Sequence, residues 1–170
     1  VYSYEKAEEI SEIALELGKV QDIMLKVVDG NSSIYPGQES GFEIAGIEED
    51  IRKLLSLKGV SINGLTSFPC FLYNKEKKRI EPTENIKAVM EAKKILKDKF
   101  SKEIEQINLP SATSVENMKI LSESGGTHGE PGHSLTGTTP MAEDVEIAEL
   151  PAYIYVSEVS HNFRGKGYFY

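Results

Sequence analysis

The sequence predicts an α/β fold with a parallel sheet, forming a portion of a (β/α)8 TIM barrel. About five strand-like runs alternate with about four helical patterns, which is typical of right-handed βαβ crossovers. Small and hydroxyl residues follow two consecutive strand-like runs, as in the paired phosphate-binding loops after the last two strands of a TIM barrel. Because a closed barrel needs about 250 residues, these 170 residues are expected to supply only part of one.

The helices are predicted from the spacing of apolar residues. Segment 5–17 repeats apolar residues on one helical face, and Gly18 follows where the helix would end. The same reasoning predicts helices at 48–57, 84–100 and 115–124. Pro82 lies two residues before the third of these helices and suits a helix start.

The strands are expected at 22–28, 60–65, 104–109, 126–130 and 152–159. The first is an almost continuous apolar run, interrupted only by Lys26, as in strands of buried parallel sheets. The last alternates apolar and polar residues like an exposed antiparallel strand. Segment 69–81 is expected to be a loop and 140–150 an acidic connector. Val1 is expected to end a further strand, so that the chain begins within a domain.

Composition limits the classes of partner. The net charge of -8 and the pI near 5.0 argue against nucleic acid or an anionic membrane, since both need a cationic face. No apolar run of roughly 18 residues and no leader are present, so neither a membrane span nor a signal peptide is expected. A single cysteine, Cys70, excludes an internal disulfide, and a cytoplasmic location is predicted. His128 and His133 lack a third convergent ligand in the sequence, so no metal site is predicted.

Five ordered segments resemble the YhfX-like branch of the alanine racemase superfamily, the fold-type III pyridoxal phosphate proteins. They are YPGQESGF (35–42), GLTSFPC (64–70), NLPSATS (108–114), EPGH (130–133) and VSEVSH (156–161). The resemblance covers essentially the whole chain. It implies a barrel portion from about strand 4 to strand 8 at residues 1–150, and the first strands of a β domain at 151–170.

The resemblance implies that pyridoxal phosphate is the cofactor and that Glu130 faces its pyridine nitrogen. Alanine racemases have arginine before Pro-Gly, whereas decarboxylases of this fold have glutamate. A carboxylate there stabilises the pyridinium and makes the ring a better electron sink for a Cα carbanion. A glutamate that only caps a turn is the alternative.

The phosphate is expected on two loops. Gly132 and His133 would supply backbone N–H groups, and Ser111 with Thr113 or Ser114 would supply hydroxyls at the start of the 115–124 helix. By composition alone, this Ser-Ala-Thr-Ser run is more often a helix N-cap. Ser67 stands where many racemases have a histidine against the cofactor ring. Ser67 is predicted among the cofactor-binding residues, but contact with the ring itself is expected from Phe68 or Cys70.

The resemblance implies that only some of the residues that move protons lie in this sequence. In this family the lysine that forms the Schiff base lies at the end of strand 1, upstream of Val1. Lys26 resembles the strand-5 lysine that some alanine racemases carbamylate to support an arginine, but Gln38 and Glu39 stand where that arginine would be. Lys26 is therefore predicted to be an active-site polar group, or else a lysine neutralised by a barrel carboxylate. Tyr170 best matches the tyrosine that enters the partner's active site in a homodimer.

The leading functional interpretation is a pyridoxal phosphate-dependent amino acid racemase or epimerase. A decarboxylase is included, because it also forms a carbanion at Cα. Its substrate would be a small-molecule amino acid. A non-catalytic pyridoxal phosphate carrier is the alternative from another class. A TIM-barrel enzyme for a sugar phosphate is the interpretation that ignores the resemblance.

Overall fold

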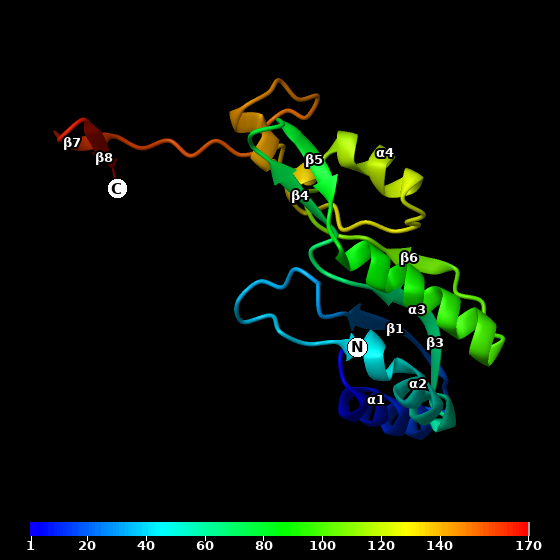
Figure 1. The fold of residues 1–170 in the computed structure, drawn as a ribbon. Helices are drawn as coiled ribbons and strands as arrows, with labels where there is room; N and C mark the ends of the chain where they lie inside the picture. The colour runs from blue at the N-terminus through cyan, green and yellow to red at the C-terminus, as the bar shows by residue number, and fades with distance from the viewer. Residues whose placement is uncertain (170) are drawn as a thin grey trace.

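The computed structural model describes residues 1–169 and has a four-stranded parallel sheet at its centre (Figure 1). The order of its strands is β2-β1-β3-β6. These strands are β1 (Gln21–Val28), β2 (Phe42–Glu43), β3 (Val60–Thr66) and β6 (Gln106–Asn108). Every neighbouring pair is parallel, so the predicted parallel α/β sheet, which forms part of a barrel, is confirmed.

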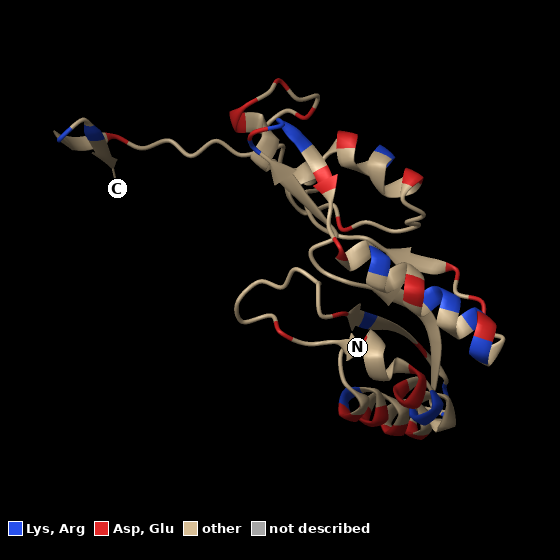
Figure 2. Cartoon of the chain, viewed as in Figure 1, with Lys and Arg blue, Asp and Glu red and all other residues tan. Residues whose placement is uncertain are grey.

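The helices begin and end within a residue of their predicted bounds. They are α1 (Tyr4–Glu16), α2 (Ile47–Ser56), α3 (Asn85–Phe100) and α4 (Val115–Glu123). Ser3 and Ser114 cap α1 and α4, because their hydroxyls accept the N–H groups of Lys6 and Asn117. The outward faces are charged, acidic along α1 and of mixed sign along α3 (Figure 2). Within residues 1–169 no helix combines the length and apolar character needed to cross a bilayer.

The two faces of the parallel sheet differ in polarity. Side chains alternate along a strand, so one face of β1 and β3 carries residues that pack with the helices in the core. These buried residues include Leu25, Val27, Ile62 and Leu65. The other face carries half-buried and mostly polar side chains, namely Met24, Lys26, Asn63, Thr66 and Asn108. The run that contains β1 is therefore fully buried on one face, whereas the other face is half-buried at Met24 and Lys26 and buried only at Val28.

A bulge in β3 determines which of its residues reach the polar face. The pairing with β1 passes from Ile23 opposite Ile62 to Met24 opposite Gly64, so Asn63 is an extra residue. A Cβ on Gly64 would lie 2.7 Å from Met24 Cε and 3.0 Å from the Gln106 carbonyl oxygen, so the backbone approaches too closely there for a side chain. Beyond the bulge, Leu65 is buried and Thr66 joins the polar face.

The segment 69–81 was predicted to be a loop, and that prediction is wrong. It contains the antiparallel hairpin of β4 (Phe71–Asn74) and β5 (Arg79–Pro82). Phe71 and Ile80 are buried, which anchors the hairpin to the core. The charged run that suggested a loop forms the turn and the outer side of the hairpin, where Lys77 and Arg79 pair with Glu81.

The predicted strand at 126–130 is reduced to a short pairing with β6. A single parallel bridge joins Asn108 to His128, supported by bonds from the N–H groups of Thr127 and His128 to the Ile107 carbonyl oxygen. Gly129 and Pro131 limit further pairing, since glycine weakens strands and proline lacks the donor. The short pairing still places Glu130 at the carboxyl edge of the sheet.

The predicted strand at 152–159 is also wrong. The described structure has an extended connector there, and pairing starts only in the antiparallel hairpin of β7 (Val159–Phe163) and β8 (Lys166–Phe169) (Figure 1). The chain reverses at Arg164 and Gly165, both in the left-handed region, and pairing extends back from that turn only to Val159. Residue 170 lies outside the described residues, and a domain boundary at 150/151 stays a prediction.

The 170 residues in isolation are expected to self-associate. Leu150, Ile154 and Val156 are 84 to 86% exposed, and the edge strands of the parallel sheet are β2 and β6. Size-exclusion chromatography with light scattering should therefore show oligomers or aggregates. A monodisperse monomer that melts cooperatively would contradict the interpretation as part of a barrel.

Candidate functional site

A row of polar side chains crosses the carboxyl ends of three neighbouring strands. Lys26 of β1 is in register with Thr66 of β3, and Thr66 is in register with Asn108 of β6. The Asn108 side-chain amide donates to Thr66 Oγ1 at 3.2 Å and to Glu130 Oε1 at 2.9 Å. The row therefore continues into Glu130, and these residues from four segments of the chain form one edge of the site.

Asn108 is a site residue that sequence reasoning missed. It belongs to a motif that was recognised, but nothing in the sequence indicated a contact with a glutamate 22 residues later. Its side-chain Oδ1 is buried and has no partner among the described residues. The one available signal was that Asn108 and Glu130 both lie at the carboxyl ends of predicted strands, which meet at one edge of a parallel sheet. Asn108 holds the Glu130 carboxylate in place through a charge-assisted hydrogen bond.

The two predicted phosphate loops do come together. Ser111, Thr113, Gly132 and His133 line one cavity of about 340 Å³, which also contains Glu130. We call it the loop cavity. Gly132 has a φ of +27°, and a Cβ there would lie 3.1 Å from Thr113 Oγ1. Only a glycine lets these two loops approach so closely without strain.

The Ser111 loop has an unusual backbone. Ser111 and Ala112 have φ angles of +98° and +48°, which are costly for residues with side chains. The Asn117 side-chain amide donates to the Ser111 carbonyl oxygen at 2.9 Å and supports this conformation from α4. Ser114 does not reach the cavity, because its buried hydroxyl caps α4. Such strained loops collect at ligand-binding sites.

A second cavity of about 300 Å³ adjoins the first and contains Lys26. We call it the Lys26 cavity; Glu130 and Phe68 line both cavities. The Lys26 ammonium donates to the Gln38 carbonyl oxygen at 2.8 Å and to Ser40 Oγ at 3.0 Å. Burial lowers the pKa of Lys26, and the charge of Glu39 opposes that shift. No ion pair joins Lys26 to a carboxylate within residues 1–169, and the alternative of a lysine neutralised by a barrel carboxylate stays a prediction.

Ser67 is one of the residues that line the Lys26 cavity. It is fully buried, and its hydroxyl accepts a hydrogen bond from the Asn85 side-chain amide at 3.1 Å. The same amide group exchanges two hydrogen bonds with the backbone of Ser33. Asn85 thereby ties the loop after β1 to the end of β3. The thiol of Cys70 donates to the Ser67 carbonyl oxygen, and burial raises the pKa of Cys70 to about 12.

The loop after β1 adds an aromatic side chain, Tyr35, that sequence reasoning missed, and it lies beside Phe68, one of the two residues expected to contact the cofactor ring. Tyr35 and Phe68 line the loop cavity, and their rings meet edge to face at 5.5 Å. The Tyr-Pro-Gly run was recognised as a motif, but its place over the cavity depends on the buried Asn85 contact. The predicted catalytic Tyr170 lies outside the described residues. Its neighbour Tyr168 stacks on His161 within the β7–β8 hairpin.

Comparison with known proteins agrees with this geometry. The family model for the N-terminal domain of alanine racemase matches residues 1–140. The uncharacterized protein YhfX of Escherichia coli (strain K12) is 39% identical over the whole of this chain, which spans 44% of the length of YhfX. The resemblance found in the five sequence segments is confirmed.

Solved structures show the same fold at low identity. AQ1208 from Aquifex aeolicus has a TM-score of 0.58 at 18% identity, covering 82% of this chain and 36% of its own. PipY of Synechococcus elongatus, solved without PLP, has a TM-score of 0.55 at 20% identity, covering 76% of this chain and 55% of its own. Diaminopimelate decarboxylase from M. jannaschii has a TM-score of 0.52 at 18% identity, covering 79% of this chain and 38% of its own. The chain belongs to the alanine racemase N-terminal domain family.

Proposed function

We propose that this chain forms part of a pyridoxal phosphate-dependent enzyme that removes a proton or a carboxyl group from Cα of an amino acid. The observation that carries the proposal is Glu130, held by Asn108 beside two closely apposed loops. A fixed carboxylate and a nearby anion site are what a protonated pyridine ring with a phosphate arm requires.

The residues of the loop cavity fit the phosphate arm. Gly132 packs against the Thr113 hydroxyl and leaves no side chain between the two loops. Gly132 and His133 begin a short helical turn, where N–H groups lack partners within the helix. Together with the Ser111 hydroxyl, these groups would hold the phosphate. Ser114 would contribute by capping α4, and Ser67 by keeping the end of β3 packed on Asn85.

Bound pyridoxal phosphate would act as an electron sink for the charge that develops at Cα. Glu130 would hold a proton on the pyridine nitrogen, and Asn108 would keep the carboxylate aimed there. Lys26 would act as a polar group in the adjoining cavity. Tyr170 would move a proton from the partner subunit of a homodimer, with residues 151–170 belonging to the β domain. We propose a cytoplasmic location for the complete protein.

A second candidate is a carrier that holds pyridoxal phosphate without turning over an amino acid. It is supported by the likeness to PipY, which was solved both with PLP bound and without PLP. The two candidates share cofactor binding and differ in chemistry at Cα.

Cofactor binding is tested by reconstituting the complete protein with pyridoxal phosphate. We expect visible absorbance and, after borohydride reduction, one modified lysine in the peptide map other than Lys26. Incubation with single-enantiomer amino acids should then yield the opposite enantiomer or carbon dioxide. Stable absorbance with neither product would favour the carrier, and absence of absorbance would reject both candidates.

A further inference from the structure

Lys26 has more donor capacity than residues 1–169 use. An ammonium group has three N–H donors, and Lys26 gives two of them to the Gln38 carbonyl oxygen and the Ser40 hydroxyl. Both partners lie in the loop that follows β1, so they fix the ammonium at the edge of the Lys26 cavity. The third donor has no protein partner among residues 1–169.

The ammonium also lacks a counterion in contact. The ion pairs among the described residues join other side chains, and Lys26 takes part in none of them. Two carboxylates face it: Glu39 acts on it at longer range, and Glu130 lines the same cavity but is bound to Asn108. A half-buried cation in this position gains stability when an external anion completes its shell.

The anion at Lys26 would be distinct from the phosphate. The loop cavity is lined by the residues that we propose to bind the phosphate, and none of them lines the Lys26 cavity. These residues are Ser111, Thr113, Gly132 and His133. Lys26 and Asn108 are two strands apart, which is roughly 10 Å at about 4.8 Å per strand. Glu130 and Phe68 lie between the two cavities and line both. A bound molecule that extends away from Glu130 can therefore reach toward Lys26.

We propose that Lys26 Nζ binds a carboxylate of the amino acid substrate, so that the enzyme selects substrates with a free carboxylate over amines and amides. This assignment rests on the proposed function, since it concerns the same site. It makes Lys26 a substrate-binding residue in ammonium form, held ready by Gln38 and Ser40.

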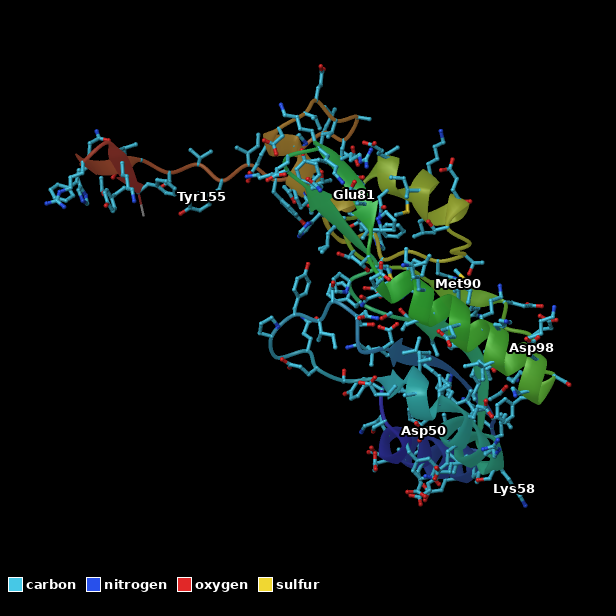
Figure 3. All side chains as sticks on the ribbon, viewed as in Figure 1. Asp50, Lys58, Glu81, Met90, Asp98 and Tyr155 are labelled. Atoms are coloured by element: carbon cyan, nitrogen blue, oxygen red, sulfur yellow. The ribbon has the colours of Figure 1, made fainter. Side chains whose placement is uncertain are left out.

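The test uses the complete protein reconstituted with pyridoxal phosphate. The absorbance of the bound cofactor is titrated with each common amino acid and with its carboxamide, which keeps the amine and removes the negative charge. The variants are Lys26→Met and Lys26→Arg, with Lys58→Met as the matched control. Lys58 is exposed at the turn before β3, on the opposite edge of the sheet (Figure 3).

In the unchanged protein at least one amino acid should bind roughly tenfold or more tightly than its amide, as expected for a hydrogen bond to a charged group. Lys26→Met should reduce that preference to about twofold or less by weakening the acid alone. Lys26→Arg should keep most of the preference because it keeps the cation. Lys58→Met should change nothing. Retained cofactor absorbance in each variant would establish that the variant is folded.

Three outcomes would overturn the proposal. Equal weakening of acid and amide in Lys26→Met would mean that Lys26 only supports the loop after β1. Weaker cofactor retention in Lys26→Met, with an unchanged preference in the fraction that still holds cofactor, would mean that Lys26 binds the cofactor phosphate. A yellow protein in which no amino acid binds better than its amide would reject the carboxylate site while leaving cofactor binding intact. Absence of cofactor absorbance in the unchanged protein would instead reject the proposed function, on which this assignment depends.

Discussion

Replacing Glu130 with glutamine in the complete protein is expected to leave the cofactor bound and to lower turnover by roughly tenfold to more than a hundredfold. The residues proposed to bind the phosphate in the loop cavity are unchanged, so the cofactor is expected to stay bound. The amide cannot stabilise a positive charge on the pyridine nitrogen, and a hydrogen bond to a charged group is worth about 1.5 to 3 kcal/mol. Turnover per bound cofactor is the quantity to measure.

Two further variants make this result interpretable. Asn108→Ala should lower turnover in the same direction, because it frees the Glu130 carboxylate while leaving its charge. Glu12→Gln, at an exposed position on α1, should leave turnover unchanged. If Glu130→Gln kept full activity, or lost cofactor as readily as a phosphate-loop variant, Glu130 would be only a turn residue.

Gly132→Ala is expected to weaken retention of pyridoxal phosphate by roughly tenfold or more, without a matching change in turnover per bound cofactor. The new Cβ would lie 3.1 Å from Thr113 Oγ1, and the backbone has a φ of +27°, so the two loops must separate. Equilibrium dialysis, followed through cofactor absorbance, measures the change.

The matched control is Gly30→Ala, because a Cβ there meets nothing within 4 Å. Ser111→Ala should weaken retention as well, since it removes a hydroxyl from the same cavity. Unchanged retention in both Gly132→Ala and Ser111→Ala would place the phosphate elsewhere.

Local sequence patterns were sufficient to predict the four helices and the two loops that contain Ser111 and Gly132. Short segments determine the spacing of apolar residues in α1 and α3 and the N-cap at Ser114. These features can therefore be predicted from the sequence alone. The β4–β5 hairpin was missed because its charged turn hid the two buried residues that anchor it, Phe71 and Ile80.

Contacts between distant segments could not be predicted in this way. The bond from Asn108 to Glu130 and the clamp of Asn85 on Ser33 join residues that approach only when the sheet forms. The half-buried face of β1 was also hidden, because Met24 makes an amphipathic strand look like a fully buried one. Resemblance to a family identified the segments, and the tertiary structure brought their side chains together.

The bulge in β3 makes the site depend on how β3 pairs with β1 as well as on residue identity. If Asn63 paired in regular register instead of bulging out, Lys26 would be in register with Leu65, and Thr66 would turn into the core. The bulge therefore keeps Thr66 opposite Lys26 although β3 has one residue more than β1 over this stretch. For relatives of this chain, the number of residues between Val60 and Thr66 is as informative as the residues themselves. A relative with one residue fewer here would keep Thr66 opposite Lys26 by regular pairing, whereas a relative with one residue more would need a further irregularity to keep them together.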